Sequence, residues 1–173
     1  MTTTPIIPTK GLRFNRETAP AFWMIDILWV LLVDSNDTGG AYSVIEQWMR
    51  KGSGALVPHV HAYSDEWFYV FEGELSMTVG DENFTGRGGD SVWIPRGAVH
   101  HFKVESEVCH VLNGYTPGGF EQVIKGLALP AQRRELPPED FPKPNQETVD
   151  KIFNNYWCAQ ADVSWAHPHT EMR

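Results

Sequence analysis

Four side chains with the chemistry of metal ligands stand out in the sequence: His59, His61, Glu66 and His100. Two histidines separated by one residue lie on the same face of a β-strand, because side chains alternate between the faces. A carboxylate follows five residues later, after a short polar turn, and His100 follows the turn at residues 95–97. If the fold brings His100 to the other three, they form a metal site of three nitrogens and one oxygen.

This ligand set suits a divalent transition metal, since imidazole nitrogen binds such ions and a carboxylate compensates their charge. Iron, nickel, manganese, cobalt, copper and zinc all remain open. Structural zinc sites are closed by four ligands and are usually rich in cysteine, which takes no part here. Three histidines and one glutamate leave open positions on a five- or six-coordinate ion, so the pattern favours a site that also binds substrate.

Short strands separated by turns make up most of the chain, and nothing between Val30 and Tyr115 has helical spacing over a useful length. About nine strands at such spacing predict an all-β sandwich or barrel of the jelly-roll kind. The clearest strands are expected at residues 23–33, as one strand or two, and at 42–49, 67–73, 74–79, 91–94, 99–104 and 108–115.

The pattern changes after residue 116. Apolar residues at helical spacing predict a short helix near 120–127, and five prolines predict an extended path through 130–144. A last amphipathic helix is expected at 146–157, with Asn145 as its N-cap. We therefore divide the chain into an N-terminal arm (1–20), a barrel (21–128) and a proline-rich C-terminal extension with one helix (129–173).

Composition narrows the class of protein. Of the 173 residues, 42% are hydrophobic and 12% aromatic, and the net charge of −8 disfavours nucleic acid and anionic membranes as partners. The most apolar segment, residues 22–33, is too short to span a bilayer. Only two cysteines, Cys109 and Cys158, and no signal-peptide pattern predict a cytoplasmic protein with buried, reduced thiols.

The spacing of the ligand residues resembles the two sequence motifs of the cupin superfamily. The first motif is matched at His59, His61, Glu66 and Gly73. The second motif is matched at Gly89, Pro95, Gly97 and His100. Two framework positions differ: Ser53 replaces the opening glycine of the first motif, and Val104 replaces the final asparagine of the second. The resemblance implies a cupin jelly-roll β-barrel, here with a short C-terminal helical extension.

Segments 37–40, 65–70 and 116–121 are similar to those of bacterial quercetinase-type cupins, which are flavonol 2,3-dioxygenases, within a resemblance that covers about residues 28–138. That family implies an enolic or phenolic substrate bound to the metal as its anion and cleaved with O2. It also implies that Glu66 serves as both ligand and base. Single-domain cupins resemble one another in pairing, so we expect a homodimer through sheet faces or the N-terminal arm.

The substrate pocket should be lined by side chains that share the phase of the ligands on regular strands. On this basis we expect Phe68 and Val70, in phase with Glu66, and Phe102, in phase with His100, to point into the barrel. Further candidates for the lining are Tyr42, Trp48 and Leu112, together with Trp29, Leu31, Val44 and Met49.

Two other functions remain open: a metal-dependent isomerase, lyase or decarboxylase that does not use O2, and a non-catalytic cupin that binds a small ligand. Three further features have simpler interpretations. His101 should face away from His100, and His110 should be structural or line the pocket. His167 and His169 near the end of the chain form an isolated pair that would bind metal only adventitiously.

Overall fold

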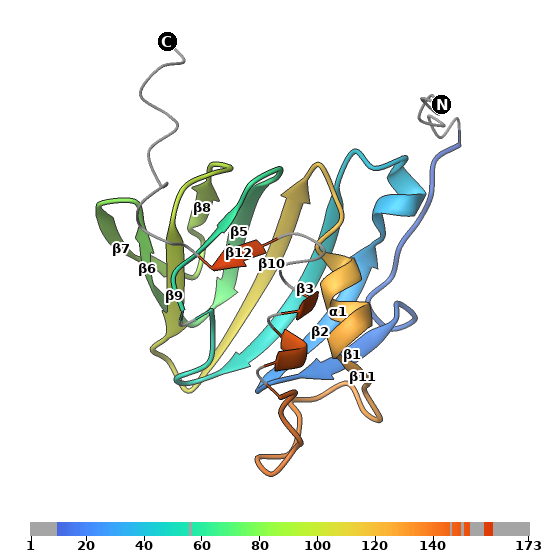
Figure 1. The fold of residues 1–173 in the computed structure, drawn as a ribbon. Helices are drawn as coiled ribbons and strands as arrows, with labels where there is room; N and C mark the ends of the chain where they lie inside the picture. Colours follow the sequence, from blue (N-terminus) through green and yellow to red (C-terminus); the bar gives the residue numbers. More distant parts are fainter. Residues whose placement is uncertain (1–9, 56, 146, 150, 153–157, 161–173) are drawn as a thin grey trace.

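Two antiparallel β-sheets packed face to face form the body of the protein in a computed structural model (Figure 1). The structure describes residues 10–55, 57–145, 147–149, 151–152 and 158–160. The larger sheet has the strand order β11-β1-β2-β3-β10-β5-β8 and the smaller has β12-β4-β9-β6-β7. This architecture confirms the all-β, jelly-roll prediction.

The strands of the larger sheet are Leu129–Pro130 (β11), Ala21–Met24 (β1), Ile27–Val33 (β2), Ser43–Arg50 (β3), Val108–Thr116 (β10), Asp65–Glu72 (β5) and Ser91–Ile94 (β8). The strands of the smaller sheet are Cys158–Gln160 (β12), His59–His61 (β4), His100–Val104 (β9), Glu74–Val79 (β6) and Glu82–Arg87 (β7). A 3-10 helix, η1, spans Ser35–Thr38, and helix α1 spans Glu121–Leu127.

The main hydrophobic core lies between the two sheets. Phe68 on β5 and Val111 on β10 contribute to it from the larger sheet, and Leu75 on β6 and Val104 on β9 from the smaller one. Ile124 of α1 joins the same core. Burial on this scale, with these side chains fully excluded from solvent, makes the interior a rigid support for any site built on its strands.

A second, smaller cluster covers the outer face of the larger sheet at β1 and β2. Trp23 and Leu28 pack there with Phe141 from the proline-rich segment, and the Trp23 ring meets the Phe141 ring edge-on at 5.4 Å. The indole nitrogen of Trp23 also donates a hydrogen bond to the backbone oxygen of Glu135, at 2.8 Å. The C-terminal extension thus covers a sheet face that would otherwise expose apolar side chains.

Most expected elements are found within a residue or two. The apolar run 23–33, expected as one strand or two, forms two, β1 and β2, which are joined by a turn where Ile25 has a φ of 59°. Asn145 caps a helical turn as expected, since its side-chain oxygen accepts a hydrogen bond from the Thr148 amide at 2.8 Å. The rest of that predicted helix, 153–157, lies outside the described residues, as do residues 1–9 of the predicted arm. The division into arm, barrel and extension stays a prediction, and Leu129–Pro130 of the expected extension pairs with β1.

Gly73 illustrates why the first motif ends in glycine. It has a φ of 92°, a conformation that L-residues with side chains rarely adopt. A Cβ at this position would also lie 2.5 Å from the backbone oxygen of Val108. The tight turn between β5 and β6 therefore requires glycine.

Among the described residues, no helix has the length and apolar character needed to cross a bilayer.

Candidate metal centre

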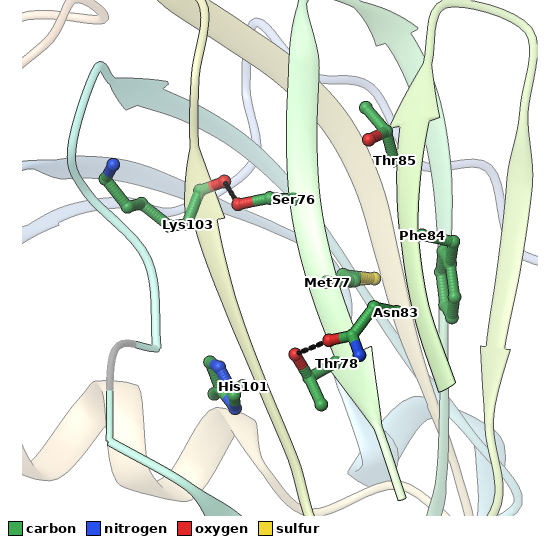
Figure 2. A pocket seen from close by; sticks show the side chains of 8 residues that line it. All are labelled: Ser76, Met77, Thr78, Asn83, Phe84, Thr85, His101 and Lys103. Atoms are coloured by element: carbon green, nitrogen blue, oxygen red, sulfur yellow. Dashed lines mark hydrogen bonds between the residues drawn. The ribbon is translucent and has the colours of Figure 1, made fainter. Parts of the chain in front are cut away.

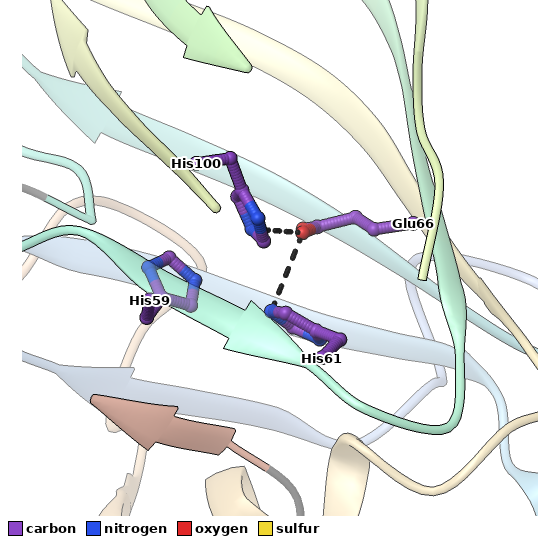
Figure 3. A group of neighbouring side chains, drawn as sticks. All are labelled: His59, His61, Glu66 and His100. Atoms are coloured by element: carbon purple, nitrogen blue, oxygen red, sulfur yellow. Dashed lines mark hydrogen bonds and ion pairs between the residues drawn. The ribbon is translucent and has the colours of Figure 1, made fainter. Parts of the chain in front are cut away.

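Three strands from both sheets bring the four predicted ligands together (Figure 3). His59 and His61 belong to β4, and His100 opens the neighbouring strand β9, where it pairs with His59. Glu66 is the second residue of β5 in the opposite sheet. His61, Glu66 and His100 are buried, whereas His59 is partly exposed. The cluster therefore bridges the two sheets and has one side toward solvent.

Contacts between the two motif turns fix this arrangement. The Arg96 guanidinium donates to both carboxylate oxygens of Asp65, at 3.0 and 3.2 Å, and the Arg96 amide donates to the same carboxylate at 2.9 Å. The amide of Gly97 donates to the backbone oxygen of His61 at 2.9 Å. The Arg96 hydrogen bonds hold the pKa of Asp65 below its ordinary value, which keeps the Asp65 carboxylate ionised in this ion pair. The second turn is thus held against the first, and His100 beside Glu66.

The ligand atoms of the four side chains converge on a small volume. Oε2 of Glu66 lies 3.1 Å from Nε2 of His100 and 3.5 Å from Nε2 of His61. One ligand atom from each residue lies within 4.8 Å of all the others. Two atoms bound about 2.1 Å from the same ion are about 3 Å apart at a right angle and about 4.2 Å apart at most, so the separations of 3.1 and 3.5 Å fit ligands of one ion.

The histidine tautomers also fit a metal ion. Nδ1 of His59 lies 3.0 Å from the backbone oxygen of Val57, and Nδ1 of His100 lies 3.0 Å from that of Ala98. Since a carbonyl only accepts, each Nδ1 carries the hydrogen, and a neutral ring then presents a lone pair at Nε2. At His100, Nε2 lies 3.1 Å from Oε2 of Glu66, a contact in which the nitrogen donates a hydrogen bond when it carries a proton. A metal ion replaces that proton when both atoms serve as its ligands.

The protonation states of His59, His61 and Glu66 at neutral pH suit a bound cation. Burial lowers the pKa of His59 to about 4 and that of His61 to about 3, with a smaller contribution from nearby His100. Burial by itself would raise the pKa of Glu66, but His61 and His100 outweigh it and lower the pKa to about 2. His59 and His61 are therefore neutral and Glu66 is ionised at pH 7, which are the protonation states that bind metals.

The second carboxylate oxygen of Glu66 has its own partners, which the sequence analysis missed. Oε1 accepts hydrogen bonds from the Tyr115 hydroxyl at 2.8 Å and from Nδ2 of Asn113 at 2.9 Å. Gln47 in turn donates through Nε2 to Oδ1 of Asn113, also at 2.9 Å. A buried asparagine and tyrosine two residues apart in the apolar strand 108–115 were the available signal, because such groups need partners.

The predicted lining residues Phe68, Val70 and Phe102 point into the barrel, and their rings or methyl groups are packed in the main core. Trp29, Leu31 and Met49 face the same interior. Beside the ligands, the Tyr115 ring stacks on Phe120 at 4.6 Å and on His61 at 5.5 Å. Tyr115 and Phe120 thus form an aromatic wall next to His61.

Four other predicted lining residues do not face the barrel interior. Trp48 and Leu112 lie on the outer face of the larger sheet, where Trp48 stacks on His110 at 4.2 Å. On β3 the candidates Val44 and Trp48 face outward, whereas the candidate Met49 faces inward with Ile45 and Gln47. Leu112 was a wrong candidate, because its neighbours Val111 and Asn113 on β10 face inward. Tyr42 precedes β3 and is 45% exposed.

The other two histidines that the structure describes, His101 and His110, are not part of the cluster. His101 faces the opposite way from His100, as expected, and lines a hollow of about 430 Å³ on the outside of the smaller sheet (Figure 2). His110 is structural, since its Nε2 lies 2.7 Å from the buried Glu46 carboxylate. A second hollow, of about 320 Å³, lies near Asn15 and Asp34. Neither hollow includes the four ligands, and His167 and His169 lie outside the described residues.

A two-sheet jelly roll with a histidine and glutamate cluster at the ends of its strands defines a cupin. Residues 47–115 match the family described as Cupin domain, and this match agrees with the cupin resemblance of the ligand motifs. Among curated proteins it is similar to quercetin 2,3-dioxygenase of Bacillus subtilis (strain 168), with 27% identity over 130 residues. That match covers 75% of this chain and 37% of the dioxygenase. A match to an uncharacterized protein of Aquifex aeolicus (strain VF5) has 36% identity and covers 35% of this chain and 50% of that protein. The chain therefore spans half or less of the curated relatives that it matches.

Solved structures with different activities share the fold. KdgF from Halomonas sp. superposes with a TM-score of 0.56 at 16% identity, covering 62% of this chain and 94% of that one. The Streptomyces nucleoside dehydratase Pac13 has a TM-score of 0.52 at 15% identity, covering 75% and 100%. Oxalate decarboxylase from Bacillus subtilis has a TM-score of 0.52 at 18% identity, covering 63% and 31%. At these identities the likeness concerns the fold alone.

Proposed function

We propose that His59, His61, Glu66 and His100 hold one divalent transition metal and that the chain is a metal-dependent cupin enzyme acting on a small molecule. The observation that carries this proposal is the convergence of one ligand atom from each of these four side chains to within 4.8 Å of all the others. Three imidazoles and one carboxylate gathered in this way form a ligand set that binds transition metals. The metal can be iron, nickel, manganese, cobalt, copper or zinc, since nitrogen and carboxylate ligands suit all of them.

The reaction we propose is cleavage of a flavonol-like or other enolic aromatic compound with O2. The similarity to quercetin 2,3-dioxygenase supports it. When bound, the metal would act as a Lewis acid that stabilises the deprotonated substrate oxygen.

The residues of the chain have distinct roles in this scheme. The neutral rings of His59 and His61 supply nitrogen lone pairs, and the ionised Glu66 supplies the negative charge. Oε2 of Glu66 is also the oxygen that can accept the proton of an enol or phenol, because Oε1 already accepts two hydrogen bonds. Phe68, Val70 and Phe102 keep the interior behind the ligands free of water.

A lyase, isomerase or decarboxylase that does not use O2 is the second candidate function. The observation that favours it is that the same fold occurs in a nucleoside dehydratase and an oxalate decarboxylase. A non-catalytic cupin that binds a small ligand is the third candidate. Oxygen uptake in the presence of substrate separates the first candidate from the second, and turnover of any kind separates both from the third.

The proposal is tested with His61→Ala and Glu66→Ala, and with His101→Ala as the matched control on the outer face of β9. Each purified chain is assayed for bound metal by elemental analysis and for O2 consumption with flavonols and other enols. We expect one metal ion per chain and turnover in the parent and the control, and loss of both in the two ligand variants. Full metal content and a normal rate in both ligand variants would refute the assignment.

We also propose that the chain forms a homodimer through a sheet face. Tyr69, Phe71 and Trp93 support this, since they are exposed on the outside of β5 and β8, and Trp93 has 63% of its surface accessible. Light scattering is expected to give twice the chain mass of 19.6 kDa, and a monomer alone would count against the proposal.

A further inference from the structure

The two carboxylate oxygens of Glu66 lie in different surroundings. Oε2 faces His61 and His100, whereas Oε1 accepts from the Tyr115 hydroxyl at 2.8 Å and from the Asn113 amide at 2.9 Å. A carboxylate normally offers a metal two equivalent oxygens and can bind through one or both. Here the protein has already occupied one of them.

The donors on Oε1 are themselves fixed. Oδ1 of Asn113 accepts from Nε2 of Gln47 at 2.9 Å, so the amide of Asn113 must direct its nitrogen toward Glu66. The same nitrogen also donates to the backbone oxygen of Trp67, at 3.1 Å. Gln47, Asn113 and Tyr115 are at most 2% exposed, so water cannot easily replace any of these hydrogen bonds.

Three adjacent strands of the larger sheet carry these hydrogen-bonded side chains. Gln47 is on β3, Asn113 and Tyr115 are on β10, and Glu66 is on β5, where it pairs directly with Tyr115. Because the side chains face the interior from neighbouring positions in one sheet, this hydrogen-bond network has the rigidity of the sheet and involves no loop.

We propose that Gln47, Asn113 and Tyr115 are positioning residues that hold Glu66 as a one-oxygen metal ligand, with only Oε2 free to face the ion. This inference depends on the proposed metal centre and adds to it the residues that set its geometry. Tyr115 and Asn113 act directly on Oε1, and Gln47 acts through Asn113. Without these donors the carboxylate is free to rotate and to bind with both oxygens.

The test measures Co²⁺ binding to the full chain after removal of metal with a chelator. The variants are Tyr115→Phe, which deletes one oxygen atom and keeps the ring, Asn113→Leu and Gln47→Leu. Tyr69→Phe is the control, since Tyr69 lies on the outer face of β5. Affinity is measured by competition with a chelator, and the visible absorption of bound cobalt reports its coordination number.

We expect Tyr115→Phe and Asn113→Leu to weaken Co²⁺ binding about 10- to 100-fold and to lower the cobalt absorption, because a second Glu66 oxygen raises the coordination number. Tyr69→Phe should match the parent. Gln47→Leu should weaken binding alone but add little to Asn113→Leu, because it acts through that residue, whereas independent losses of packing would add. Should Asn113→Leu fail to fold, Tyr115→Phe and Gln47→Leu decide the matter by affinity and spectrum.

Parent-like affinity and spectrum in both Tyr115→Phe and Gln47→Leu would overturn the inference. If Glu66→Ala abolishes binding in the same experiment, the metal centre itself stands. If Glu66→Ala binds cobalt as the parent does, the metal centre fails and the inference fails with it.

Discussion

Metal binding should stabilise the whole fold, because the ligands come from both sheets and separate when the chain unfolds. His59 and His100 belong to strands of the smaller sheet, and Glu66 to a strand of the larger one. An ion that binds only the folded state at 100 times its dissociation constant adds about 2.7 kcal/mol to the free energy of unfolding. For a chain of 173 residues this raises the melting temperature by about 5–11 °C.

The assay is thermal unfolding, followed by circular dichroism, of chelator-treated protein at several Co²⁺ or Zn²⁺ concentrations. Each tenfold increase above the dissociation constant should add about 1.4 kcal/mol, or about 3–6 °C. Glu66→Ala should lose most of the shift, whereas a variant with His167 and His169 both changed to alanine should keep it. The reasoning is refuted if Glu66→Ala keeps the parent's shift, since the stabilising ion would then bind elsewhere.

Three further predictions concern acid stability, the core and the outer face. The metal-free chain should lose stability as the pH falls from about 6.5 toward 3. His59 and His61 have ordinary pKa values of 6.5, but their pKa values in the fold are about 4 and 3. The unfolded state therefore binds protons at a higher pH than the folded state does. The lowered pKa of Glu66 extends this loss of stability from pH 4.5 toward 2. Urea unfolding at a series of pH values measures the free energy of unfolding, and changing both histidines to glutamine should flatten its pH dependence between pH 6.5 and 4. Phe68→Ala should lower the free energy of unfolding by about 3–5 kcal/mol, because the ring is fully buried in the core; a cost below 1 kcal/mol by urea titration would contradict that packing. Trp48→Phe should leave Co²⁺ affinity unchanged, since Trp48 lies outside the barrel, and a tenfold change would contradict its placement.

Sequence spacing predicted the ligand cluster because its geometry is mostly local. Alternation on a strand puts His59 and His61 on one face, and the short turn to Glu66 limits how far the carboxylate can lie from them. Only His100 required long-range knowledge, which came from resemblance to the second cupin motif. Its position in the structure depends on the ion pair between Asp65 and Arg96, two residues that are 31 positions apart in the sequence.

The phase of β3 could not be predicted, because both of its faces are covered. Trp48 packs against the outer cluster, and Glu46 is buried there beside His110, whereas Gln47 faces the core. Hydrophobic alternation therefore did not distinguish the two faces, and the lining candidates on β3 came from both. The polar interior position is occupied because Gln47 has Asn113 as its partner on the neighbouring strand, and such pairing is visible only in the folded chain.

The sequence left one strand or two open for residues 23–33, because it did not locate the turn between β1 and β2. Turns with positive φ are normally marked by glycine or asparagine, but here Ile25 has a φ of 59° within an apolar run. Nothing local to the sequence distinguishes one long buried strand from two short ones in such a segment.

The most direct test of the central claim is a crystal structure of the isolated protein with anomalous scattering recorded at the absorption edges of the bound elements. The account predicts one transition-metal ion per chain within about 2.0–2.3 Å of a nitrogen of His59, His61 and His100 and of Oε2 of Glu66. Side chains that point apart, or a site that holds no ion even after soaking with cobalt, nickel, zinc or iron, would contradict it.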